Sequence, residues 1–112
     1  MQSEVWIDVG ARDELARKPV QPIAVEQMKI ALVCKDGQFG AISGVCNHFG
    51  GPLGEGKLEG DYVVCPWHAW KYYYRTGRGD PGFEHDGVAA YDVRVENGHV
   101  LVRSLPRPTS AE

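Results

Sequence analysis

Two cysteine–histidine pairs constrain this 112-residue chain more than any other feature. The first is Cys46-Asn47-His48 and the second is Cys65-Pro66-Trp67-His68, with sixteen residues between His48 and Cys65. Both pairs lie in loop-like sequence, because Ser43-Gly44 precedes the first and a proline follows Cys65 directly. Loops can bend around a bound ion, so the two pairs predict one metal centre held between two loops.

Two kinds of metal centre are compatible with this ligand set. Tetrahedral zinc accepts two cysteines and two histidines, and short-spaced pairs are typical of zinc sites. Zinc fingers, however, commonly have both cysteines in one pair, whereas each pair here contains one cysteine and one histidine. Mixed pairs suit a [2Fe–2S] centre in which one iron takes both cysteines and the other takes both histidines, because each loop then gives one ligand to each iron. The pattern favours the iron–sulfur centre, and structural zinc remains the alternative.

The order C-x-H … C-P-W-H, with Gly50-Gly51-Pro52-Leu53 after the first pair, resembles the Rieske family. The resemblance extends over roughly the whole chain and is most specific at residues 46–77. It implies one Rieske-type [2Fe–2S] cofactor, with Cys46 and Cys65 on the inner iron and His48 and His68 on the outer iron. It also implies that Tyr72, four residues after His68, donates a hydrogen bond to a ligand sulfur.

The glycines after the first pair have two interpretations. Sulfide and thiolate acceptors need backbone N–H donors, and glycine lets the backbone approach closely, so Gly50 and Gly51 are candidate cofactor-binding residues. Ordinary turn glycines would give the same density.

Four positions depart from the high-potential members of the family. Those members join the two ligand loops by a disulfide, whose matching positions here are Gly51 and Trp67. They also have a hydroxyl donor where this chain has Trp70, and a glycine where it has Ala69. Each missing donor leaves the negative charge of the reduced cluster less compensated, which lowers the reduction potential. The pattern resembles the Rieske-type ferredoxins and Rieske domains of bacterial ring-hydroxylating oxygenase systems.

Short alternating segments separated by turn signals predict an all-β fold. With the resemblance, they indicate a small antiparallel β-sandwich with an inserted cluster-binding subdomain. We expect one domain over residues 1–105 and a flexible tail over 106–112. Asp36-Gly37 and Asn97-Gly98 are type I′ hairpin signals. The expected elements are a helical turn within 11–17 and strands at 5–9, 22–26, 29–35, 38–43, 57–64 with a turn at 59–61, 70–75, 88–96 and 99–104.

Composition excludes several classes of function. The net charge is −3 and there is no basic run, so nothing indicates nucleic-acid binding. No apolar run approaches the roughly 18 residues of a membrane span, and the first residues do not resemble a signal peptide. The third cysteine, Cys34, is in phase with Ile30 and Leu32, so we expect it to be a small buried side chain. It leaves no pair for a disulfide framework, which favours a cytoplasmic location.

The sequence therefore predicts a soluble one-electron carrier that passes electrons from a reductase to an oxygenase-type terminal enzyme. It is not expected to be an enzyme itself, since a mononuclear iron site would need a further two-histidine, one-carboxylate set on another domain. One alternative is a Rieske subunit or excised domain of a larger oxidoreductase of the oxygenase or nitrite-reductase type. Another is a zinc-stabilised interaction module. Nothing in the sequence indicates an oligomeric state.

Overall fold

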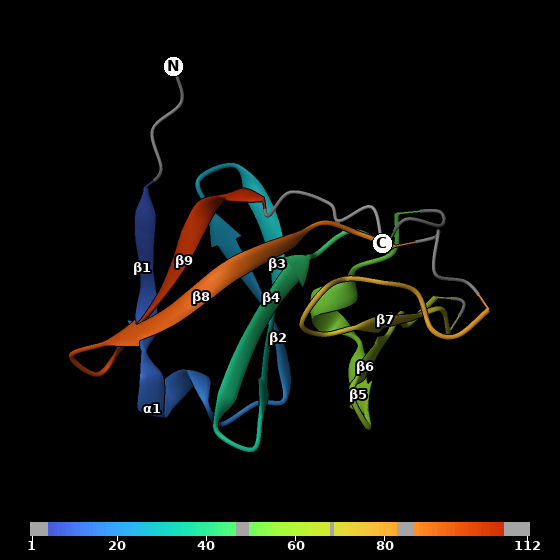
Figure 1. The fold of residues 1–112 in the computed structure, drawn as a ribbon, viewed down its shortest axis with the longest axis horizontal. Helices are drawn as coiled ribbons and strands as arrows, with labels where there is room; N and C mark the ends of the chain where they lie inside the picture. The colour runs from blue at the N-terminus through green and yellow to red at the C-terminus, as the bar shows by residue number, and fades with distance from the viewer. Residues whose placement is uncertain (1–4, 47–49, 68, 83–86, 107–112) are drawn as a thin grey trace.

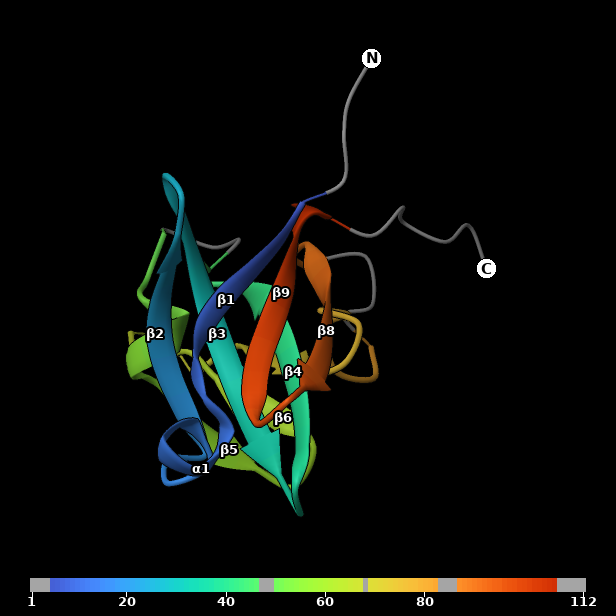
Figure 2. The ribbon, with the colours of Figure 1, turned by 90° about the vertical axis from the view of Figure 1, so that its left-hand side faces the viewer.

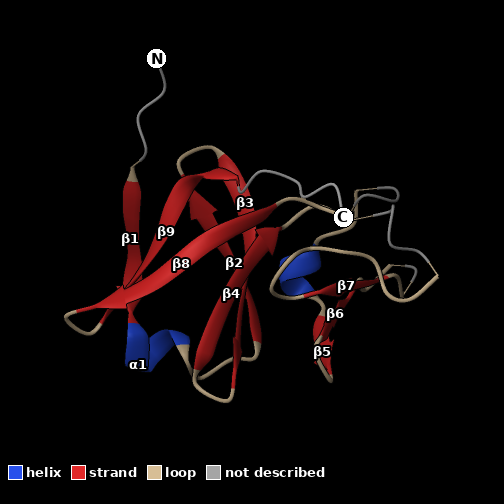
Figure 3. Cartoon of the chain, in the orientation of Figure 1, coloured by secondary structure: helices blue, strands red, loops and turns tan. Residues whose placement is uncertain are grey.

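The chain folds into two antiparallel sheets of unequal size, as Figures 1 and 3 show. The computed structural model describes residues 5–46, 50–67, 69–82 and 87–106. Its elements, in chain order, are β1 (Trp6–Ala11), α1 (Arg12–Leu15), β2 (Val20–Val25), β3 (Met28–Lys35), β4 (Gln38–Ser43), the 3₁₀ turn η1 (Leu53–Glu55), β5 (Lys57–Glu59), β6 (Tyr62–Val64), β7 (Lys71–Tyr73), β8 (Ala90–Glu96) and β9 (His99–Pro106).

The larger sheet has six strands in the order β1-β9-β8-β4-β3-β2. It curls on itself, so that its two halves face each other as layers (Figure 2). Alternate side chains point into the space between the layers, among them Ile30 and Leu32 from β3 and Val100 and Val102 from β9, all at most 1% exposed. The predicted small β-sandwich is confirmed, and curling of one sheet produces both of its layers.

Strand β3 is buried on both faces. Ile30 and Leu32 lie in the core between the layers, while Ala31 and Val33 pack in a second core against the inserted segment. This double burial explains the continuous apolar run from Ile30 to Val33, because no position in it faces water. The second core therefore connects the large sheet to the insertion.

The insertion between β4 and β8 contains η1 and the three-stranded sheet β5-β6-β7. It is fixed to the large sheet on two sides. An ion pair joins Lys35 to Asp61, and Arg75 donates a hydrogen bond to Gln38. On the other side η1 packs on the edge strand β2, so closely that a side-chain carbon at Gly54 would lie 2.6 Å from Pro22 Cα. These contacts hold the insertion as a distinct unit against one layer, which is the inserted subdomain predicted from the sequence.

Both predicted hairpin turns are present. Asp36 and Gly37 have φ of 52° and 80°, and Asn97 and Gly98 have φ of 52° and 79°, the left-handed values that a type I′ turn requires. Elsewhere the element boundaries differ from the sequence prediction by a few residues. β1 runs on to Ala11, β7 covers only 71–73, and β9 extends to Pro106, one residue into the predicted tail.

One prediction about burial is wrong. Cys34 is only half-buried, although its phase matches that of Ile30 and Leu32. It lies one residue before the end of β3, beside the hairpin turn at Asp36, and the residues that follow it, 35–39, are half-buried or exposed as well. In the described part of the chain, no helix is both long enough and apolar enough to cross a membrane.

Candidate metal centre

The two cysteines predicted as ligands follow strands of different sheets. Cys46 comes three residues after β4 of the large sheet, and Cys65 directly follows β6 of the small sheet. Neither forms a disulfide, and both are buried, 3% and 1% exposed, in the core shared by the large sheet and the insertion. The fold thus brings two buried sulfur atoms from separate sheets into one core.

The backbone of the first loop is closed by two hydrogen bonds. The N–H of Cys46 donates to the carbonyl of Gly51 at 2.7 Å, and the N–H of Gly50 donates back to the carbonyl of Cys46 at 3.2 Å. Gly50 has φ of 71°, a left-handed conformation that glycine adopts without steric cost. The requirement for a glycine at this position is therefore conformational.

The second loop repeats this pattern of hydrogen bonds. The N–H of Cys65 donates to the carbonyl of Trp70 at 2.8 Å, and the N–H of Ala69 donates to the carbonyl of Cys65 at 3.0 Å. In each loop the bonds join the cysteine to the residues four and five positions later. Ala69 consequently occupies the place of Gly50 and has φ of 61°, although it carries a side chain.

Gly51 lies against the second loop. A Cβ atom at this position would be 2.7 Å from Cys65 Sγ and 3.2 Å from two ring atoms of Trp67. Only glycine leaves room for the sulfur there. The space beside Gly51, which any side chain would fill, is called the steric cradle below. The N–H donor role of Gly51 stays a prediction, and the contact that the structure shows at this glycine is steric.

Tyr72 is fully buried, and its hydroxyl oxygen lies 3.1 Å from Cys46 Sγ. A thiolate ligand accepts hydrogen bonds, so with a metal bound the tyrosine O–H is the donor. Tyr72 lies in the middle of β7 and is paired with Val63 of β6, which fixes the position of its ring. The structure thus places the hydroxyl next to a candidate ligand sulfur, as the resemblance implied.

The candidate histidine ligands His48 and His68 lie outside the described residues. Within the described part of the chain, no group of three or more histidine, cysteine or acidic side chains could hold a metal ion. The described portion of the site is therefore its sulfur half. Two buried free thiols, a hydroxyl donor on one of them and a steric cradle beside the other fit the cysteine-held iron of a Rieske-type cluster.

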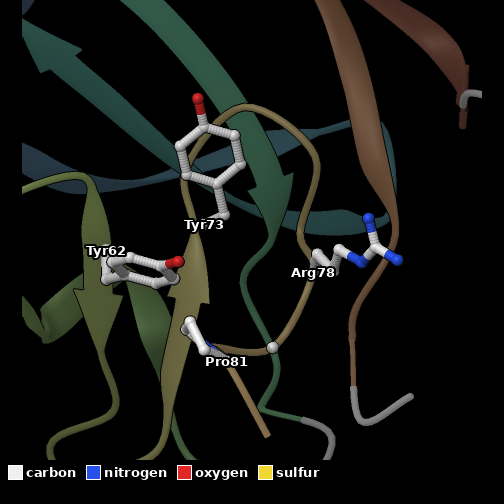
Figure 4. Close-up of a pocket in the computed structure, with 5 residues that line it drawn as sticks. Tyr62, Tyr73, Arg78 and Pro81 are labelled. Carbon is white, nitrogen blue, oxygen red and sulfur yellow. The ribbon is translucent and has the colours of Figure 1, made fainter. Parts of the chain in front are cut away.

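The loop that contains Pro81 runs alongside β7. A bridge joins Gly79 to Tyr72, and the N–H of Asp80 donates to the carbonyl of Lys71 at 3.2 Å. Pro81 lines a pocket of about 280 Å³ with Tyr62 and Tyr73, and Figure 4 shows the guanidinium of Arg78 directed away from the two tyrosine rings. The loop is thus attached to the strand that carries the hydroxyl donor.

A hollow of about 450 Å³ lies beside the second loop, with Cys65 and Trp67 in its wall. Glu59 also lines it and forms ion pairs with Lys57 at 3.2 Å and Lys71 at 3.5 Å. The hydrogen bond from Lys57, followed by the charges of Lys57 and Lys71, lowers the pKa of Glu59 below its ordinary value. The sequence does not predict that Lys57, Glu59 and Lys71 lie together beside this hollow, because their positions depend on the register of β5, β6 and β7.

This chain is similar to known proteins over most of its length. The family model of the Rieske [2Fe–2S] domain matches residues 5–92. The ferredoxin component of an alkene monooxygenase system from Xanthobacter autotrophicus is 31% identical over 109 residues, covering 96% of this chain and 88% of that protein. The ferredoxin component of a naphthalene 1,2-dioxygenase system from Pseudomonas aeruginosa is 29% identical over 100 residues, covering 89% and 96%.

Solved structures show the same fold. The ferredoxin of carbazole 1,9a-dioxygenase from Nocardioides aromaticivorans superposes with a TM-score of 0.80 at 26% identity, covering 88% of this chain and 96% of that one. A chain from a complex of reduced oxygenase and oxidised ferredoxin in carbazole 1,9a-dioxygenase superposes with a TM-score of 0.83 at 24% identity, covering 94% and 98%.

Proposed function

The chain belongs to the Rieske [2Fe–2S] family, and from this premise we propose that it carries single electrons from a reductase to an oxygenase-type terminal enzyme. It is an electron-transfer protein and not a catalyst, as its relatives are ferredoxin components of oxygenase systems. We further propose a cytoplasmic location, which is supported by the free state of all three cysteines.

The observation that carries the proposal is the pair of buried free thiols in two loops with the same hydrogen-bond pattern. We propose that Cys46 and Cys65 hold one iron and that His48 and His68 hold the other, as the family pattern of this sequence implies. When bound, the cluster supplies a site that gains and loses one electron. The chain's own residues close the loops, keep bulk water from the two sulfurs and present one hydroxyl donor.

The surroundings of the sulfurs also indicate a low reduction potential. Tyr72 places a hydroxyl 3.1 Å from Cys46 Sγ. Trp70 contributes its carbonyl to the loop but has no side-chain hydroxyl to donate. Rieske centres span roughly −150 to +300 mV, and from the absence of one donor and of the interloop disulfide we propose a potential at or below about 0 mV.

Absorbance and electron paramagnetic resonance spectra of anaerobically purified protein test this function, together with iron and sulfide analysis. We expect about two irons and two sulfides per chain and a visible spectrum that bleaches on one-electron reduction. The Cys65→Ser variant should lose that spectrum, while the control Cys34→Ser should keep it. Stoichiometric zinc without sulfide would instead support the zinc-stabilised module, and colour loss in the Cys34 variant alone would refute the ligand assignment.

The electron-transfer role needs a separate measurement. The reduced protein should be reoxidised within seconds by a terminal oxygenase component and rereduced by its reductase. A ferredoxin-dependent ring-hydroxylating system lacking its own ferredoxin is a suitable assay. A centre with a potential near +300 mV would be unable to pass electrons forward in such a chain and would contradict the proposal.

A further inference from the structure

The indole ring of Trp67 covers Gly51, although the two residues belong to different ligand loops. A Cβ atom at Gly51 would be 3.2 Å from the Cγ and Cδ2 atoms of the ring, so the glycine backbone lies in direct contact with it. Gly51 is buried even though it has no side chain to protect it, while 57% of Trp67 is exposed. The ring thus lies across the boundary between the loops, with one side on Gly51 and the rest toward solvent.

The contact also involves the ligand sulfur. The same Cβ position at Gly51 is 2.7 Å from Cys65 Sγ, so glycine, sulfur and indole meet at one point. A larger residue at position 51 would push both the sulfur and the ring outward. The absence of a side chain there is what allows the indole to approach the first loop.

Positions 51 and 67 match the two cysteines that form the interloop disulfide in high-potential members of the family. Here no disulfide can join the loops at these positions, since neither residue is a cysteine. Each loop is closed by its own backbone hydrogen bonds, which run from Cys46 to Gly50 and Gly51 and from Cys65 to Ala69 and Trp70. These bonds fix the shape of each loop but do not hold one loop to the other.

We propose that Trp67 is a positioning residue whose indole ring holds the two ligand loops together and shields Cys65 Sγ from water. The proposal rests on the [2Fe–2S] centre proposed above, in which each loop supplies a ligand to each iron. Separation of the loops therefore breaks the ligand set, and the van der Waals contact between Trp67 and Gly51 opposes that separation where a disulfide is absent. Because the contact needs a flat ring, phenylalanine can replace it in part and alanine cannot.

The experiment compares Trp67→Ala, Trp67→Phe and the control Trp6→Ala in the holoprotein. Trp6 is half-buried and lies on β1, on the opposite side of the molecule from the insertion (Figure 1). The guanidinium carbon of Arg94 is 4.3 Å from the centroid of its ring. The first measurement is the rate at which visible absorbance is lost to excess ferrous chelator after reduction. The second is the reduction potential.

We expect Trp67→Ala to lose iron about tenfold faster than the unchanged protein, the scale of one lost aromatic contact. Trp67→Phe should lie within about threefold, and Trp6→Ala should match the unchanged protein. The potential of Trp67→Ala should rise, because water that reaches Cys65 Sγ stabilises the more negative, reduced state. The potential of Trp6→Ala should not move.

Three results would overturn the proposal. They are unchanged iron loss and potential in Trp67→Ala, equal losses in the phenylalanine and alanine variants, and iron loss in Trp6→Ala as fast as in Trp67→Ala. A failure of the electron-carrier function is a separate outcome, since it would appear as absence of the two-iron spectrum in the unchanged protein before any variant is compared.

Discussion

Ala69 is in a backbone conformation that costs free energy, and replacing it by glycine should stabilise the protein. Its φ of 61° lies in the left-handed region, where an L-residue with a Cβ atom is disfavoured by roughly 1–2 kcal/mol. The hydrogen bond from its N–H to the carbonyl of Cys65 holds it there. Glycine removes the steric cost but loses about 0.4–1 kcal/mol more backbone entropy on folding.

The difference between these two terms predicts that Ala69→Gly raises the free energy of unfolding by about 0.5–1 kcal/mol. For a domain of this size that corresponds to an increase in melting temperature of about 2–4 °C. The reciprocal control is Gly50→Ala in the first loop. Its φ is 71°, and among the described residues the nearest atom to an added Cβ is Val45 Cγ1 at 3.8 Å, an ordinary van der Waals distance, so we expect the cost of the substitution to be conformational. It should lower the free energy of unfolding by a similar amount.

Differential scanning calorimetry of the holoprotein at several scan rates measures both variants, with visible absorbance recorded to verify that each retains its iron. The scan-rate series is needed because unfolding with cofactor loss is not a simple two-state process. A decrease in melting temperature for Ala69→Gly would refute the argument. An unchanged value for Gly50→Ala would show that the left-handed conformation is not what these loops require.

Three other changes have defined outcomes. Tyr72→Phe removes the hydroxyl that lies next to Cys46 Sγ and should lower the reduction potential by tens of millivolts, since 59 mV is about 1.4 kcal/mol for one electron. Protein-film voltammetry measures this change, and an unchanged or higher potential would contradict a donor role. Gly51→Ala places a Cβ atom 2.7 Å from Cys65 Sγ and should cost about 1–3 kcal/mol of stability with loss of iron, whereas full iron occupancy would show that the cradle can widen. Because the pKa of Glu59 is lowered, its ion pairs stabilise the fold fully above the ordinary carboxyl range, and this stabilisation is lost as pH falls through the folded-state pKa. The Glu59→Gln variant should therefore lose less melting temperature than the unchanged protein when the pH is lowered below about 4. An identical dependence of melting temperature on pH in the two proteins would contradict this.

The elements that the sequence predicted well are those with local signals. Asp36-Gly37 and Asn97-Gly98 specify hairpins because their backbone torsions suit type I′ turns, and these turns fix the register of the strands on either side. The strand boundaries were less well predicted and differ from the structure by a few residues. Cys34 shows the limit of this reasoning, since its phase predicts the face it points to but not how far the opposite layer extends over it.

The features that could not be predicted depend on contacts between distant segments. Ala69 has no local property that favours a left-handed backbone, and its strain follows from the hydrogen bonds of its loop. The available signal was that Ala69 and Gly50 both lie four residues after a cysteine, so that the two positions could share the left-handed backbone conformation. The contact between Trp67 and Gly51 and the curling of the sheet likewise require the two loops or two layers to be in place, so no window of sequence contains them.

The placement of the sulfurs explains why this site needs both sheets. Cys46 and Cys65 share a core with Tyr72 and Val63 of the insertion and with Val33 of the large sheet. The other core, between the layers of the large sheet, contains neither of these cysteines. A group bound to both sulfurs therefore stabilises the contact between the insertion and the large sheet, and it adds little to the packing between the two layers. Cofactor binding and folding of the insertion are in this sense coupled, while the curled sheet has a core of its own that contains neither ligand sulfur.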